Sequence, residues 1–130
     1  MNPQQGVFSL ADSFKSFSKT ATGSNTAVYT VPTANEGAVP PVLPTTAIVK
    51  SIRLSYQTGG AVTTTVAVLD YDASSPLEIE LYKDSLADGA ELEVLTHPVV
   101  LEQQDAVKIL GNNVKILVSL MEITYWQTIA

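Results

Sequence analysis

The stretch from Thr45 to Trp126 is an almost unbroken series of apolar or alternating segments separated by turn residues. Because successive side chains of a strand point to opposite faces of a sheet, such alternation is typical of strands with one buried face. β-Branched residues are abundant in the segments, and Gly, Asp, Asn and Ser cluster between them. The expected strands are 26–31, 45–57, 61–71, 77–86, 91–95, 98–102, 106–110 and 114–126.

This spacing predicts an all-β protein, an antiparallel β-sandwich or jelly roll of about seven to eight strands. Strands do not alternate with helical patterns, which argues against an α/β fold. With 130 residues and 45% hydrophobic content, the chain fits one domain with a buried core. We divide it into an N-terminal arm, residues 1–25, and a β-sandwich domain, residues 26–130, which contains a proline-rich loop at 32–46.

The alternation also predicts which side chains share a face. In 45–57 one face is expected to carry Ile48, Ile52, Leu54 and Tyr56, and the other Val49, Ser51, Arg53 and Ser55. In 77–86 the inward side chains are expected to be Leu77, Ile79 and Leu81, and the outward ones Glu78, Glu80 and Tyr82. Both are patterns of half-buried strands.

The N-terminal 25 residues are polar and small, yet they contain all three phenylalanines of the chain, Phe8, Phe14 and Phe17. Since disordered tails are poor in aromatic residues, these rings are expected to dock on a surface. Leu10, Phe14 and Phe17 fit helical spacing, which allows a short amphipathic helix packed on its own domain. The alternative is an arm that reaches a neighbouring subunit.

Two further segments are candidate contact surfaces. Four of the seven prolines lie in 32–44, so this segment is expected to be an extended surface loop, and its apolar Val39, Val42 and Leu43 suggest that it lies against something. Tyr125 and Trp126 are either anchors of an interface or residues that close the core.

The distribution of charge excludes one class of partner. Only 15% of the residues are charged, so part of the surface is either covered by neighbouring subunits or rich in Ser and Thr. Of the thirteen acidic residues, all but Asp12, Glu36 and Glu122 lie between Asp70 and Asp105, where Lys83 is the single base. Phosphate backbones require Lys and Arg, so direct nucleic-acid binding by this acidic part is not expected.

Nothing in the sequence indicates a reaction centre. The chain has no cysteine and one histidine, His97, and lacks the G-x-S-x-G pattern of a nucleophile elbow. The acids near Gly89 do not follow the calcium-loop pattern, and Gly59-Gly60 has the character of a hairpin turn. We therefore expect no catalytic, cofactor-binding or metal-binding residue, and the absence of a signal peptide or apolar span predicts a soluble chain that does not bind a membrane.

The order of several motifs resembles small virion proteins of tailed bacteriophages. The matching tracts are VYTVP, AIVKSIRLSYQTGGAVTTTVAVLD, LYKDSLADGAELEVLTHPVVLEQQDAVKIL and VKILVSLMEI, which together cover roughly residues 28–124. Within them an L-x-x-G-x-x-L-E-x-L tract runs from Leu86 to Leu95, and a P-x-V-L-E-x-x-D-x-x-K segment from Pro98 to Lys108. The usual glycine of the turn before Asp105 is replaced by Gln104, which puts the geometry of that turn in doubt.

The resemblance implies a capsid decoration (cement) protein that binds the outer capsid lattice and stabilises the head without catalysis. Its implied partners are the major capsid protein or other virion proteins and further copies of itself, a trimer being usual in such proteins. Its implied place is the capsid surface of the virion, after synthesis in the host cytoplasm. The alternatives are a neck, tail or fibre subunit, or a glycan-binding β-sandwich with Tyr71 and Tyr82 as an aromatic platform. The residues expected at a partner interface are Phe8, Phe14, Phe17, Val39, Val42, Leu43, Tyr125 and Trp126.

Overall fold

The computed structural model describes residues 7–35, 37–72 and 75–128, and within them the chain forms nine β-strands. They are β1 (Val7–Thr20), β2 (Thr26–Thr30), β3 (Thr45–Tyr56), β4 (Val62–Asp70), β5 (Leu77–Leu86), β6 (Ala90–Glu93), β7 (Val99–Leu101), β8 (Ala106–Leu110) and β9 (Lys115–Thr128). Eight of them match the eight expected strands to within a few residues. The described residues contain no helix.

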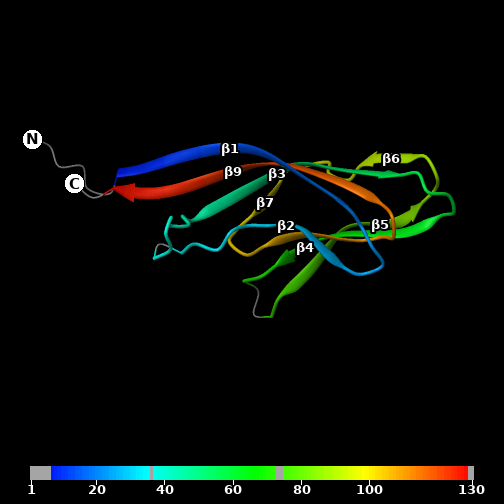
Figure 1. Cartoon of the computed structure of the whole chain (residues 1–130), viewed down its shortest axis with the longest axis horizontal. Coiled ribbons are helices and arrows are strands. Elements are labelled where there is room, and N and C mark those ends of the chain that lie inside the picture. Colours follow the sequence, from blue (N-terminus) through cyan, green and yellow to red (C-terminus); the bar gives the residue numbers. More distant parts are fainter. Residues whose placement is uncertain (1–6, 36, 73–74, 129–130) are drawn as a thin grey trace, which may run out of the picture.

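The strands form two antiparallel sheets (Figure 1). Sheet A has the order β1-β9-β3-β6, with β7 also paired to β3, and sheet B has the order β2-β8-β4-β5. The inner faces of the two sheets enclose the core, whose largest fully buried side chains include Ile52, Leu54, Leu101, Ile109, Ile116 and Leu120. The predicted all-β sandwich is confirmed.

Residues 7–20 are the element that the sequence pattern did not identify. They form β1, an edge strand of sheet A that pairs with β9 from Val7↔Thr128 to Thr20↔Lys115. The alternative of a short helix is therefore wrong for these residues. The predicted boundary at residue 25 falls between β1 of sheet A and β2 of sheet B, so both sides of it belong to the sandwich. The division into an arm and a domain stays a prediction.

An irregularity in β3 changes which of its residues face the core. The pairing with β9 shifts between Val49 and Ser51, so Lys50 has no opposite residue in the ladder. As a result Val49 is buried together with Ile52, whereas Ile48 lies on the outer face. The predicted face of Ile48 and Val49 was wrong, because an extra residue in a strand reverses the alternation on one side of it.

Two turns have backbone that L-residues rarely adopt. Gln104 has φ 70° in the turn before Asp105, and Asn113 has φ 67° in the turn before β9. Asn113 suits its position, since Asn tolerates positive φ. At Gln104 the same left-handed geometry is kept although the side chain does not favour it, because Asp105 holds the turn with hydrogen bonds from the backbone N–H groups of Glu102 and Tyr71.

Candidate interaction surfaces

An apolar row crosses the outer face of sheet A. Phe14 on β1 pairs with Met121 on β9, Met121 pairs with Ile48 on β3, and Ile48 pairs with Val100 on β7. Phe14 is 75% exposed and Val100 is 61% exposed, while Met121 and Ile48 are half-buried. We call these four residues the sheet A row. Directly opposed residues lie on the same face of a sheet, so their side chains make a continuous apolar stripe.

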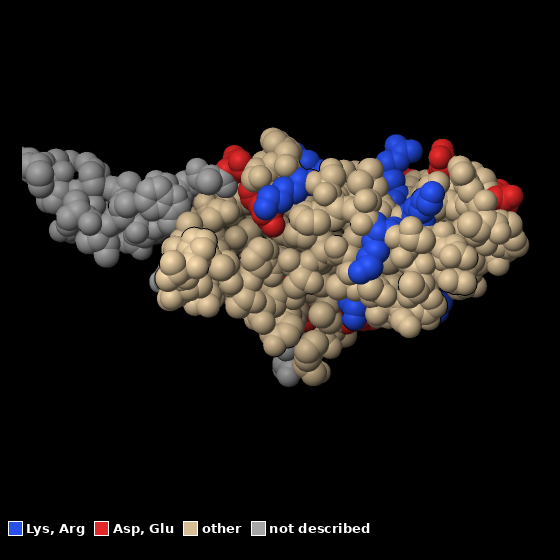
Figure 2. Space-filling model, viewed as in Figure 1, with Lys and Arg blue, Asp and Glu red and all other residues tan. Residues whose placement is uncertain are grey.

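The surroundings of Phe14 suit contact with another protein. The Lys50 ammonium lies 5.8 Å from the centre of the Phe14 ring, and a shallow hollow of about 180 Å³ between them is lined by Ser16 and Ser119. Phenylalanine is enriched at protein interfaces, so the exposed Phe14 ring is a candidate contact residue. Figure 2 shows that the visible face carries few charges. Lys and Arg are scattered over it, and most of the surface is neither basic nor acidic.

Phe17, in contrast, has a role inside the molecule. Its ring lies 4.8 Å from the ring of Tyr29 on β2 and is half-buried, so it helps to close the core between the edges of the two sheets. That Phe17 contacts a partner stays a prediction. In the structure its ring contacts Tyr29 of its own chain. The side chains of Phe8 and Trp126 lie outside the described residues, although their backbone belongs to β1 and β9.

The proline-rich loop lies at the end of the sandwich where β1 begins and β9 ends (Figure 1). The backbone N–H of Tyr125 donates to the carbonyl of Pro44 at 2.9 Å, and a bridge joins Asn35 to Val42. Val39 at the tip is 99% exposed, whereas Leu43 and Tyr125 are half-buried. The loop is therefore held at its base and presents Val39 and Val42 to solvent.

A buried polar cluster ties the two sheets together beneath β1. The Tyr29 hydroxyl donates a 2.6 Å hydrogen bond to Glu122, and the Lys15 ammonium lies 2.7 Å from the other carboxylate oxygen. Burial opposes ionisation of Glu122, but the bonds from Lys15 and Tyr29 outweigh it, so the pKa of Glu122 is lowered. Burial, and then the adjacent Glu122, raise the pKa of Tyr29. The only sequence signal for this cluster is the lone acid Glu122 in an apolar strand.

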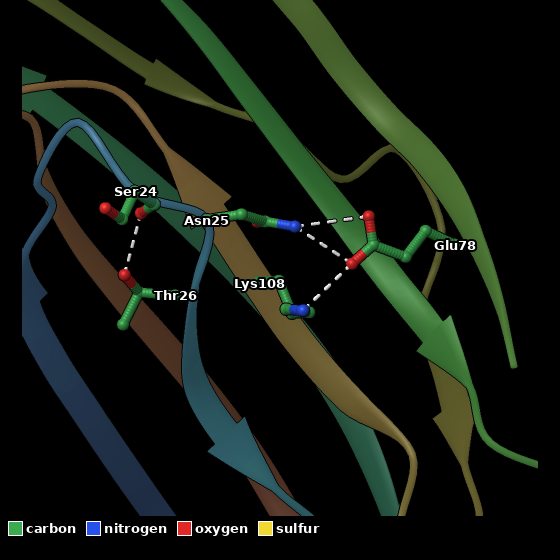
Figure 3. Close-up of polar contacts among 5 residues, drawn as sticks. All are labelled: Ser24, Asn25, Thr26, Glu78 and Lys108. Carbon is green, nitrogen blue, oxygen red and sulfur yellow. Dashed lines mark hydrogen bonds and ion pairs between the residues drawn. The ribbon is translucent and has the colours of Figure 1, made fainter.

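A second polar cluster lies on the outer face of sheet B (Figure 3). The Lys108 ammonium is 3.0 Å from Glu78, and the Asn25 amide donates to the same carboxylate at 2.9 Å. The Lys108 bond is the main reason that the pKa of Glu78 is lowered. The cluster connects the turn before β2 with β8 and β5 on the outer face of sheet B.

Several acidic side chains of the described residues accept hydrogen bonds from nearby backbone N–H groups. In the described residues, no three His, Cys, Asp or Glu side chains lie close enough to hold a metal ion. Glu93 accepts bonds from Ser51 and from the backbone N–H of Ile52, and Asp105 holds the turn at Gln104. His97 is exposed in the connection between β6 and β7. These acids organise the backbone.

Tyr71 and Tyr82 do not form one platform. Tyr71 follows the last residue of β4, whereas Tyr82 pairs with Val66 near the middle of that strand. Five residues of extended chain span roughly 16 Å, which is too far for the two rings to stack on one sugar. Within the described part of the chain, no helix is long and apolar enough to cross a bilayer.

Comparison with known proteins gave similarity in structure alone. No family model matches the chain, and no curated protein matches it in sequence. A subunit of the disulfide-linked pili on Bacillus endospores is 13% identical with a TM-score of 0.48, and the match covers 95% of this chain and 93% of that one.

Capsid proteins of infectious bursal disease virus, in T=1 and T=13 particles, are 8% identical with a TM-score of 0.40. These matches cover 95% of this chain but 36% of the capsid protein, so the chain spans about a third of their length. Similarity this low supports no statement about function. The neighbours are proteins of a pilus and of virus particles.

Proposed function

We propose that the protein is a bacteriophage capsid decoration protein, which binds the outer capsid lattice and stabilises the head without catalysis. The observation that carries this proposal is the sheet A row, because four apolar side chains in register, two exposed and two half-buried, form an apolar surface suited to another protein. The resemblance of residues 28–124 to small virion proteins supplies the class of partner. The protein would act on the surface of the virion.

The physical basis of such a function is rigidity combined with a contact surface. Two packed sheets whose edges are joined by the Glu122 cluster resist deformation, so force applied at one point is transmitted across the domain. The exposed loop tip at Val39 is stiffened by neighbouring prolines, so ordering it on a partner costs less entropy than ordering a flexible loop. A protein with these properties stabilises a lattice by bridging its subunits.

The first test is a protein count on purified particles of the phage that encodes this chain. A copy number equal to that of the major capsid protein, or a simple fraction of it, is expected for a lattice-bound protein. A copy number of a few per cent would overturn the decoration proposal in favour of a neck, tail or fibre subunit. Absence from the particle would overturn both.

The second test addresses the surface itself. Phe14→Ser is expected to weaken binding of the purified chain to particles that lack it by about tenfold or more, because exposed aromatic anchors dominate interface energies. Leu110→Ser is the matched control, since Leu110 is an exposed apolar residue on the outer face of sheet B. Equal binding of the Phe14 variant and the wild type would show that the sheet A row is not the capsid contact.

A further inference from the structure

The inner face of β5 is not covered by sheet A. Ile79 pairs with Val68, whose side chain is in the core, so Ile79 points the same way. Nevertheless Ile79 is 49% exposed, and Leu77 is 55% exposed. The half-buried pattern predicted for this strand is therefore wrong for these two residues. The reason is that sheet A ends here at β7, a strand of three residues. The predicted pattern is also wrong for Tyr82, which was expected to point outward but pairs with the buried Val66 and packs against the core, because the ladder shifts by one residue there.

This gap is a groove between the two sheets. It encloses about 410 Å³ and is lined by the apolar side chains of Val68, Ile79, Leu81 and Val99, with Asp70, Glu102 and Asp105 at its acidic side. In the described residues β5 pairs with β4 alone, and β6 and β7 pair with β3 alone. Both sheets therefore end on this side of the sandwich in strands whose outer backbone groups have no strand partner.

The opposite side of the sandwich is closed. There β1 and β2 are the last strands of sheets A and B among the described residues. The ring pair Phe17–Tyr29 and the Lys15–Glu122–Tyr29 cluster fill the space between them. The molecule thus has one side with an open groove and one side with a filled edge, and the two sides differ in shape.

Strand direction makes these two sides complementary. Neighbouring strands are antiparallel throughout both sheets. If a second copy in the same orientation is placed beside the first, its β1 therefore runs antiparallel to β7 and its β2 runs antiparallel to β5. Both sheets continue across the junction with the pairing that they already use.

Charge also favours this arrangement. The closed side carries the exposed Lys19 on β1, and the open side carries the exposed Glu80 on β5 in addition to the acids of the groove. The apolar stem of Lys19 can lie against the edge of the neighbouring copy while its ammonium group reaches these acids. Two like sides brought together would instead oppose charges of the same sign.

We propose that copies of this chain associate head to tail, with the β1–β2 side of one copy seated on the groove between β5 and β7 of the next. The interface is heterologous, so it produces a closed ring or an open filament according to the rotation between copies. The proposal concerns the purified chain alone and is independent of the capsid contact proposed above.

The register of sheet B indicates one charge pair across this interface. Ala27, Lys108, Ala67 and Glu80 form a single row across β2, β8, β4 and β5. Continuation of the row places Ala27 of the second copy beside Glu80 of the first. The Lys19 ammonium already lies 3.5 Å from the Ala27 carbonyl in its own chain, so it is placed to meet Glu80 of the neighbour.

The test is a charge exchange, followed by sedimentation of the full-length chain over a range of concentrations. The wild type is expected to associate, and Lys19→Glu or Glu80→Lys alone to weaken association by about tenfold or more, because each places like charges together. Mixing the two variants is expected to restore association, since each then offers the charge that the other lacks. Matched controls are Lys115→Glu and Asp88→Lys, exposed residues on the outer face of sheet A and in the turn after β5.

A wild type that remains monomeric at about 1 mM overturns the proposal, because even weak specific association has a dissociation constant in this range. It is overturned as well if the mixture stays as dissociated as the separate variants, which would indicate an interface between like sides. Capsid binding by Phe14→Ser is measured separately, so either proposal can fail while the other stands. Far-UV circular dichroism of each variant confirms that the sheets are intact.

Discussion

The hydroxyl of Tyr29 on β2 donates a hydrogen bond to the carboxylate of Glu122 on β9, so one side-chain contact crosses the interior from sheet B to sheet A. Lys15 binds the same carboxylate from β1. A single buried acid on the last strand, β9, therefore joins it to the first two strands, β1 and β2. The cluster is fully satisfied, which is the condition under which buried polar groups specify a unique arrangement of strands.

Removal of the Tyr29 hydroxyl is expected to destabilise the protein. Tyr29→Phe keeps the ring against Phe17 but leaves one oxygen of a buried carboxylate without its donor, at a cost of about 1–3 kcal/mol. The free energy of unfolding from urea titration measures the effect. Tyr71→Phe is the control because Tyr71 is exposed, and an equal loss in both variants would contradict the importance of the buried bond.

Glu122 also predicts how stability depends on pH. Its pKa in the folded chain is lowered from the ordinary value of 4.5, so its contribution is fully present above that pH and is lost as the pH falls through the lowered value. Glu122→Gln is expected to reduce the loss of stability between neutral and acidic pH. Urea midpoints of the wild type and variant at neutral pH and below pH 4.5 test this, and parallel pH profiles would refute it.

Gly111 is a position at which a single methyl group is expected to be harmful. A Cβ there would lie 2.9 Å from the hydroxyl oxygen of Thr64, and Thr64 is fully buried and cannot move away easily. Gly111→Ala is therefore expected to lower stability by about 1–3 kcal/mol through overpacking. Gly23→Ala, where the added atom meets open space, should change it little. Thermal melting of the two variants distinguishes these outcomes.

Gln104 offers a gain in stability. A residue with a Cβ pays about 1–2 kcal/mol for the left-handed conformation, and glycine avoids this cost. Glycine also has greater conformational entropy in the unfolded chain, which offsets part of this gain. Gln104→Gly is therefore expected to raise the free energy of unfolding by up to about 1 kcal/mol. Asn113→Gly should give a smaller gain, because Asn already tolerates this geometry. A loss of stability at Gln104 would show that its side chain makes a compensating contact.

The sequence predicted the strands of the core better than the strands at its edges. From Thr45 onward, the alternation of apolar and polar residues and the positions of turn residues indicated the same strands. The reason is that most of these strands have one face on the core and end at Gly, Asp or Asn. In β1 the signal was absent, since Phe14 faces solvent and Lys15 faces the interior, where it binds Glu122. A charged residue pointing inward and an aromatic one pointing outward reverse the usual pattern of an amphipathic strand.

The residues expected at a partner interface stay predictions. Phe14 and Val39 are exposed, as an interface residue must be. The row that Phe14 forms with Met121, Ile48 and Val100 could not be predicted, because strand pairing cannot be read from a single sequence. Its alignment also depends on the irregularity at Lys50, which moves Ile48 to the outer face. The groove beside β5 was not foreseen, because nothing in the sequence of that strand reveals that β7 is too short to cover it.

The pairing of β1 with β9 has a consequence for how the protein is made. β1 is the first described strand to leave the ribosome, and the strand that it pairs with follows after all seven others. During translation β1 therefore waits without its partner, and sheet A closes at this edge only through a contact of very large sequence separation. Such contacts slow folding, so β1 is expected to join the structure late, and until then its backbone is open to chaperones or to another chain.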